Sequence, residues 1–235
     1  MAMKDSLVGM VEKTATRSVR SGMDLKALKD LVRKGESHHL EFKLKANHPE
    51  KIIREVVAFA NSQGGTLLIG VSDDKQIPGL KFADEEEYIL VRAIDKYCTP
   101  KIQYRLERIS VSPDREVLIF VIPPSSEKPH YVLDAPDSEH KKVFIRHQDK
   151  SIQASKEVRQ ILKWKDRANN VQFRYGRKEE ILMKHLGEHE EITVETLSKI
   201  AKIPIWLASK TLITLVLANV LKILPDETAD KYIML

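Results

Sequence analysis

Apolar residues recur at helical spacing in two stretches of the N-terminal half of the chain. The first stretch follows Asp24, a favourable N-cap residue, and stops at Gly35. The second begins near Pro49, which the first turn of a helix tolerates, and stops at the pair Gly64-Gly65. Both stretches predict helices with one apolar face, and the glycine pair predicts a positive-φ stop before a strand.

In the rest of the first 165 residues, segments with the lengths of strands and of helices follow one another. Residues 66–71, TLLIGV, are an unbroken apolar run too short for a helix, which predicts a central strand, and a strand at about 39–45 is expected before it. The later elements are expected as a helix at 84–98, strands at 101–111 and 116–122 joined through Pro113-Asp114, a long loop at 124–140, a strand at 142–147 and a helix from Ser155. This order predicts an α+β fold, a mixed sheet with packed helices.

The last sixty residues have a different pattern. Three helical stretches, at 177–189, 193–202 and 204–221, precede two short apolar segments around a polar turn at 222–235. Three helices and a hairpin predict a small winged helix-turn-helix domain. The expected organisation is an N-terminal extension at 1–23, a main domain at 24–168, a linker at 169–175 and a winged-helix domain at 176–235.

Charge is distributed unevenly along the 235 residues. The net charge is +5 overall, but residues 176–235 carry −1 and residues 1–175 carry +6. Nine basic and two acidic residues fall within 150–178. This segment is therefore the expected contact for a polyanion such as nucleic acid.

Composition excludes several classes of protein. No apolar run approaches the roughly 20 residues that cross a bilayer, and the N-terminus lacks the pattern of a secretory signal. The single cysteine, Cys98, cannot form an internal disulfide and is expected in the core. We expect a cytoplasmic protein without membrane contact.

Acidic residues gather at the expected strand ends. Glu41 and Lys43 share one face of the first strand, Glu36 precedes it, and Asp73-Asp74 follow the central strand. If the two strands pair, three or four carboxylates converge, and oxygen ligands of this kind hold Mg²⁺ or Mn²⁺. Solvated acids at strand ends are the simpler interpretation, and both remain open.

The expected helix from Ser155 carries a basic stripe. Its basic residues fall on one face and its aliphatic residues on the other. The stripe comprises Lys156, Arg159, Lys163 and Arg167. Trp164, Phe173 and Tyr175 lie nearby and have rings that stack on bases, although core packing is the expected use of Trp164. A solvated helix followed by a linker is the alternative.

Four blocks of sequence resemble the Schlafen-type AlbA-like domain. They lie between about residues 24 and 165 and read GESHHLEFK, IIREVVAFANSQGGTLLIGVSDDKQIPGL, IPPSSEKPHYV and VFIRHQDKSIQAS. The last block contains the Arg, Ser and Ala of the family pattern, here Arg146, Ser151 and Ala154. Where relatives often read Gly-Val-Asp-Asp, this chain has Ser72 before its two aspartates.

The resemblance implies two activities. Many members are nucleic-acid-binding or regulator-like proteins, and we add Arg146 to the expected nucleic-acid contacts. Some animal Schlafens cleave structured RNA with two glutamates and one aspartate. The matching positions here are Glu36, Glu41 and either Asp73 or Asp74, with Lys43 beside them.

These observations predict a nucleic-acid-binding protein with a regulatory role. A nuclease that uses Mg²⁺ or Mn²⁺ is one alternative, and an assembly protein that uses its winged helix for protein contacts is another. No other cofactor is expected. One set of family blocks implies one lobe of a nucleic-acid groove, and the expected third C-terminal helix is mostly apolar, so we also expect a homodimer.

Overall fold

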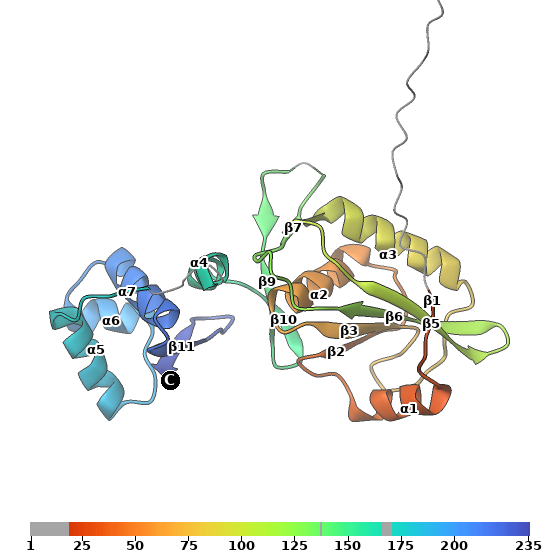
Figure 1. The fold of residues 1–235 in the computed structure, drawn as a ribbon, viewed down its shortest axis with the longest axis horizontal. Coiled ribbons are helices and arrows are strands. Elements are labelled where there is room, and N and C mark those ends of the chain that lie inside the picture. The colour runs from red at the N-terminus through yellow and green to blue at the C-terminus, as the bar shows by residue number, and fades with distance from the viewer. Residues whose placement is uncertain (1–18, 137, 166–170) are drawn as a thin grey trace, which may run out of the picture.

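The computed structural model describes residues 19–136, 138–165 and 171–235, which form a larger N-terminal and a smaller C-terminal unit (Figure 1). The N-terminal unit contains β1 (Val19–Arg20), α1 (Leu25–Lys34), β2 (Leu40–Lys43), α2 (Pro49–Asn61), β3 (Gly65–Ile69), α3 (Ala83–Tyr97), β4 (Cys98–Thr99), β5 (Arg105–Ser112), β6 (Arg115–Ile122), β7 (Tyr131–Leu133), β8 (Lys141–Lys142), β9 (Phe144–His147) and β10 (Lys150–Gln153). Helix α4 (Lys156–Lys165) leads to the C-terminal unit of α5 (Arg177–Glu188), α6 (Val194–Ala201), α7 (Ile205–Leu217), β11 (Leu221–Leu224) and β12 (Lys231–Met234).

Five strands form one mixed sheet in the order β1-β5-β6-β3-β2. Strands β2 and β3 are parallel, with Glu41 opposite Leu67, whereas β6 runs antiparallel to both β3 and β5. The predicted α+β fold with a mixed sheet is confirmed. Strand β1 pairs in parallel with β5, so Val19 and Arg20 of the expected extension form an edge of the sheet.

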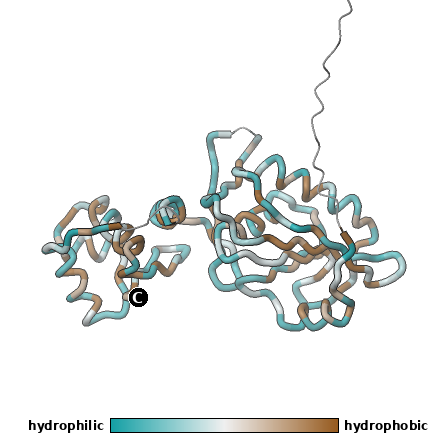
Figure 2. The backbone as a smooth tube through the Cα atoms, in the orientation of Figure 1, coloured by the Kyte–Doolittle hydropathy of each residue, from teal (hydrophilic) through white to brown (hydrophobic). Residues whose placement is uncertain are grey.

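Helices cover both faces of the sheet. On one face, Leu67 and Ile69 of β3 pack in a core with α2 and α3, and on the other face Leu68 packs with α1. Both faces of β3 are therefore buried, as its unbroken apolar sequence predicted. Figure 2 shows the hydrophobic residues concentrated along these central strands.

The glycine pair that ends α2 has the predicted role. Gly64 has φ +76°, and a Cβ atom there would lie 2.7 Å from the carbonyl oxygen of Ile122. A Cβ atom on Gly65 would lie 2.2 Å from the ring of Phe59. The positive-φ stop is confirmed at Gly64, and both positions exclude side chains because other groups occupy the space.

The segment expected as one long loop at 124–140 is partly structured. Strand β7 lies within it and pairs with β4 on one side and β8 on the other. A strand of three residues is too short to show alternation, so its partners, and not its own sequence, define it. The strand expected at 142–147 is divided, because Lys142 pairs with β7 and residues 144–147 pair with β10.

The C-terminal unit has the predicted order of three helices and a hairpin. Helices α6 and α7 meet at 116° across a short turn, and β11 pairs antiparallel with β12. Ile192, between α5 and α6, forms a bridge with Tyr232 of the hairpin. Assignment of this unit to the winged-helix class stays a prediction. Within the described residues, no single helix is both long and apolar enough to cross a bilayer.

Candidate functional site

A buried ion-pair network around Arg146 occupies the centre of the family motifs. The Arg146 side chain is 0% exposed, and one of its terminal nitrogens lies 3.0 Å from Glu41 and 2.7 Å from Glu55. The other donates to the carbonyl oxygen of Ser37 at 2.7 Å. The guanidinium also lies 4.8 Å from the centre of the Phe59 ring. Arg146, which we expected to contact nucleic acid, is enclosed by the protein in this structure.

Several elements that are distant in the sequence bring these groups together. Glu41 comes from β2, Glu55 from α2 and Arg146 from β9. In the hairpin register Ser151 of β10 lies opposite Arg146, and its hydroxyl donates to Glu55. The network therefore joins the main sheet, α2 and the β9–β10 hairpin.

The network balances two carboxylates with two cations. Lys43 donates to Glu41 from the next position on the same face of β2. Burial raises the pKa of the Glu55 carboxyl, with a further increase from the negative charge of Glu41. Arg146 and Ser151 oppose this effect because they stabilise the charged carboxylate.

The other predicted acids lie around the edge of this network. Glu36 accepts a hydrogen bond from the backbone N–H of Phe42 at 2.9 Å. Burial raises the pKa of Glu36, and the charges of Glu41 and Asp73 also raise it. Asp73 and Asp74 are exposed in the loop after β3, and Asp74 accepts from the hydroxyl of Ser72. The turn between Ser37 and Leu40 folds Glu36 back beside β2, and the pairing of β2 with β3 brings the Asp73 loop close enough for its charge to act on Glu36.

These carboxylates do not fit a divalent ion as they stand. Glu41 is paired with both Lys43 and Arg146, and Asp74 is bonded within its own loop. Over the described ranges, no three His, Cys, Asp or Glu side chains are placed so that they could hold a metal ion. The acids expected to hold Mg²⁺ or Mn²⁺ therefore lie near the β2 edge of the sheet but do not form a ligand shell.

Helix α4 has the expected division into two faces. Lys156, Arg159 and Lys163 are exposed, whereas Val158 and Ile161 on the opposite side are buried. We call these three exposed cations the α4 stripe. Arg167, expected as a fourth member, lies outside the described residues.

The surroundings of α4 differ from expectation in two respects. Trp164 was expected in the core but is 48% exposed, with the ammonium of Lys163 5.8 Å from the centre of its ring. Val158 packs on Ile145 and Ile152 of the β9–β10 hairpin and not on the main sheet. The ring is left outside because the hairpin and α7 cover only one side of a ten-residue helix.

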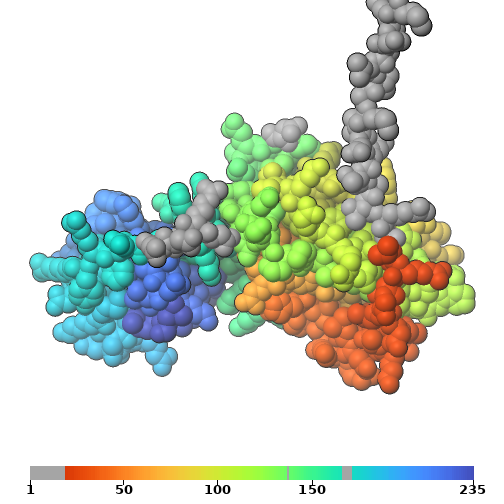
Figure 3. All heavy atoms as spheres, in the orientation of Figure 1, coloured from red at the N-terminus to blue at the C-terminus, as the bar shows by residue number. Residues whose placement is uncertain are grey.

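Helix α4 also contacts the C-terminal unit through partly buried polar groups. Glu157 accepts a hydrogen bond from Ser209 of α7, and Ser155, at the start of α4, donates to Asp230 beside β12. Ile223 of β11 packs at the edge of the same cluster as Val158. Figure 3 shows α4 at the narrow region between the two units.

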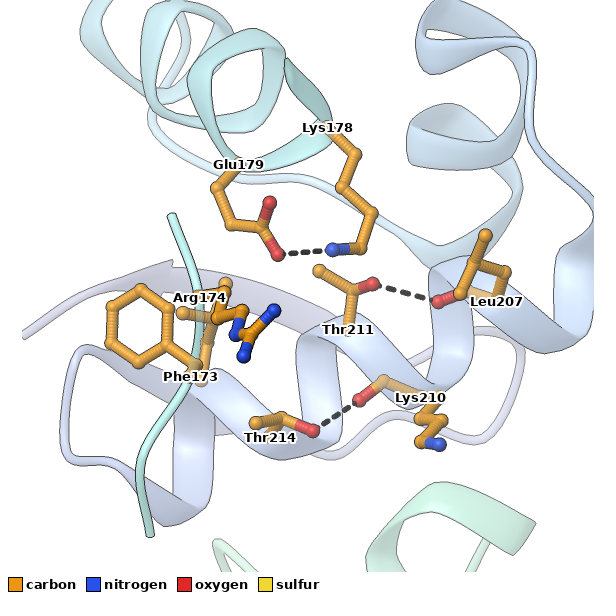
Figure 4. Close-up of a pocket in the computed structure, with 9 residues that line it drawn as sticks. Phe173, Arg174, Lys178, Glu179, Leu207, Lys210, Thr211 and Thr214 are labelled. Atoms are coloured by element: carbon orange, nitrogen blue, oxygen red, sulfur yellow. Dashed lines mark hydrogen bonds and ion pairs between the residues drawn. The ribbon is translucent and has the colours of Figure 1, made fainter. Parts of the chain in front are cut away.

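A basic hollow lies within the C-terminal unit between the segment before α5 and the side of α7 (Figure 4). Arg174, Lys178 and Lys210 line it together with apolar side chains. Lys178 is paired with the buried Glu179, whose carboxylate also accepts from the backbone N–H of Gly176. Phe173, at one wall, packs against the core of the unit.

The sequence analysis did not predict the roles of two members of the Arg146 network, Glu55 and Ser151. Glu55 borders the apolar face of α2, three residues after Ile52 and four before Phe59, and an acid in that position is a signal for a buried partner. Ser151 was noted only as a family residue, and nothing in its local sequence indicates that its hydroxyl bonds to a helix.

Asn61, the last residue of α2, connects distant segments through its side chain. Its amide nitrogen donates to the carbonyl oxygens of His130 and Phe144, both at 2.9 Å, and its oxygen accepts from the backbone N–H of His130 at 2.7 Å. It therefore connects α2 to β9 and to the segment before β7. A buried amide with three such bonds fixes the position of the hairpin that carries Arg146.

The sequence profile of the family described as Schlafen, AlbA_2 matches residues 36–155. This match spans half of the chain and includes every member of the Arg146 network. The chain therefore belongs to the Schlafen AlbA_2 family, and the family indicates a nucleic-acid-related role. The α4 stripe begins just after the matched region. No curated protein matches the chain.

Two solved structures are similar to this chain at low identity. One is the N-terminal domain of an ATP-dependent DNA helicase RecG-related protein from Nitrosomonas europaea, with 17% identity, TM-score 0.37 and coverage of 55% of this chain and 94% of that one. The other is the DIP2311 protein from Corynebacterium diphtheriae, with 16% identity and TM-score 0.38. The latter match covers 64% of this chain but only 32% of that protein.

Proposed function

We propose that the protein binds nucleic acid through contacts between the phosphate backbone and the α4 stripe. The observation that carries the proposal is that Lys156, Arg159 and Lys163 are all exposed on the side of α4 opposite its buried residues. Exposed cations on a rigid helix neutralise successive phosphates without reading base sequence.

Two further observations support this proposal. The family indicates a nucleic-acid-related role, and the positive charge is concentrated before residue 176. The C-terminal unit adds an arrangement compatible with a winged helix, since a 116° angle between α6 and α7 lies in the range of helix-turn-helix motifs. A transcriptional regulator is the specific role that we infer from a basic surface combined with such a unit.

Replacement of Lys156, Arg159 and Lys163 by Ala tests the proposal. We expect weaker binding and a smaller salt dependence, because each lost phosphate contact reduces the slope of log K against log salt by about 0.9 on duplex DNA and about 0.7 on single strands. The measurement is fluorescence anisotropy of labelled oligonucleotides over a series of salt concentrations.

The matched control replaces Lys26, Lys29 and Lys34 of α1, which are also exposed, by Ala. This variant loses the same net charge at a different surface. Equal slopes for the two variants would show that only net charge matters, and an unchanged slope in the α4 variant would remove the stripe from the interface.

Exposed apolar residues favour an assembly role as a second candidate. Ile205 and Trp206 at the start of α7 and Ile200 at the end of α6 are exposed around one turn. In contrast, α7 offers few side chains that read base edges, with Lys210 its exposed cation. In this second candidate function, the turn contacts protein and the C-terminal unit does not read DNA sequence.

A parallel experiment distinguishes the nuclease alternative from the nucleic-acid-binding protein. RNA integrity is measured after incubation with Mn²⁺ and, in parallel, with EDTA. Cleavage that requires Mn²⁺ and disappears in Glu41→Gln, with the fold retained, would favour the nuclease. Binding without cleavage in both solutions supports the binding protein, the outcome that we expect from the paired state of Glu41.

A further inference from the structure

We propose that Trp164 is a base-stacking platform and that the nucleic acid bound at α4 is single-stranded. This inference rests on the proposed function and specifies its substrate class. Trp164 lies in the last turn of α4 and is 48% exposed, although it is one of the largest apolar side chains of the helix. Its ring is accessible at the surface that carries the stripe.

The cations around Trp164 favour a polyanion as the occupant. Lys163 lies 5.8 Å from the ring centre, and Lys165 follows Trp164 in the chain and is exposed. On a helical projection Gln160 lies between Trp164 and Lys156, so the ring is continuous with the stripe. An apolar protein partner would have to desolvate these ammonium groups, whereas phosphates pair with them.

A flat ring beside cations suits unpaired bases better than a duplex. In a duplex the base faces are already stacked on their neighbours, and a protein reaches only the base edges in the grooves. Reading such edges requires polar side chains, and Gln160 is the amide that the exposed side of α4 offers for this purpose. In a single strand the base faces are free to stack on an aromatic side chain while the backbone lies along the basic residues.

A Trp206→Phe background makes Trp164 the sole tryptophan, because the chain contains two. Trp206 is itself exposed on α7, so little packing is lost in this background. Titration with single-stranded DNA, single-stranded RNA and the corresponding duplex is expected to quench Trp164 fluorescence strongly with one or both single strands and weakly with the duplex. The two single-stranded arms decide which sugar is preferred.

Trp164→Ala is expected to weaken single-strand binding by about 5-fold to about 150-fold, the range of one lost base stack, and to leave duplex binding nearly unchanged. Trp164→Phe should retain most of the affinity because it keeps a ring. The matched control is Tyr88→Ala, since Tyr88 of α3 is 62% exposed and has the guanidinium of Arg92 5.5 Å from its ring centre.

The outcomes distinguish the inference from the proposed function. If the wild-type protein binds neither single strands nor duplex, the proposed function fails and this inference fails with it. If it binds but Trp164→Ala has no effect, lowers both affinities equally, or matches Tyr88→Ala, only the stacking inference is overturned. Selective loss of single-strand affinity, restored by Phe, supports it.

Discussion

At the scale of single residues, Arg146 shows how burial changes the role of a charged side chain. An arginine on a strand within a nucleic-acid-related family is an obvious candidate for a phosphate contact. Here both Glu41 and Glu55 bind it in the interior, and Phe59 lies beneath it. Removing one partner of a buried ion pair is costly because the remaining charge keeps its desolvation penalty.

Arg146→Met is therefore expected to lower the free energy of unfolding by about 3–5 kcal/mol, since it leaves two buried carboxylates without their guanidinium. Urea denaturation measures the loss. Arg33→Met is the control, because Arg33 forms an ion pair with Asp30 at 3.0 Å, similar in length, but is largely exposed. That variant should change stability by less than about 1 kcal/mol. Similar losses in both variants would contradict a structural role for the network.

At the scale of elements, the β9–β10 hairpin connects the candidate site to the C-terminal unit. Alternation along a strand places Arg146 and Ser151 on one face and Ile145 and Ile152 on the other. The first face enters the ion-pair network and the second packs against α4. Helix α4 is thus fixed from both units, which keeps its stripe in a defined orientation.

Asp230, which accepts a hydrogen bond from Ser155 at the start of α4, is expected to make the stability of the protein depend on pH. Burial raises the pKa of Asp230, Glu157 and Asp226 raise it further, and the hydrogen bond from Ser155 opposes this. Because the pKa in the folded protein lies above the unfolded value of about 3.9, the native state binds the proton more readily. The contribution of Asp230 to the free energy of unfolding therefore falls as pH rises from about 4 through the raised pKa.

Asp230→Asn removes this titration. The free energy of unfolding of the variant, relative to the wild-type protein, is expected to increase between pH 4 and neutral pH. Urea denaturation at several pH values measures the difference, and Asp114→Asn, in the exposed β5–β6 turn, provides the control. A difference that is independent of pH, or one that decreases as pH rises, would rule out this linkage.

At the scale of the whole molecule, the reasons for expecting a homodimer have changed. Much of the apolar surface of α7 is covered within the chain, because Leu212 and Leu215 pack in the C-terminal core and Ser209 bonds to α4. On α7, Ile205 and Trp206 remain exposed, and this turn is the surface that we propose for a second copy. The homodimer stays a prediction and now has a defined surface.

Light scattering at micromolar concentration is expected to give twice the 26.9 kDa mass of one chain. Trp206→Glu should shift the protein toward the monomer, because it places a charge in an apolar contact. Phe82→Glu is the control, since Phe82 is similarly exposed at the start of α3. A wild-type mass of one chain, or dissociation by both variants, would exclude a dimer built on the α7 turn.

The sequence by itself determined most elements and the division of their faces. The unbroken apolar run of β3, the glycine stop at Gly64 and the opposed faces of α4 follow from local rules, namely strand and helix periodicity and backbone freedom. The family motifs also predicted the fold class, because their order along the chain can be read from the sequence without knowing which segments are in contact.

Only the tertiary structure decided what the charged and aromatic residues contact. Arg146 and Glu41 are buried partners from strands about a hundred residues apart, Asn61 joins two distant segments, and Trp164 remains exposed because none of the described elements covers its side of α4. Periodicity states which face of an element a residue occupies but not what lies opposite that face. Pairing between distant segments, which sets burial and therefore the cost of a charge, is fixed only when the whole chain is folded.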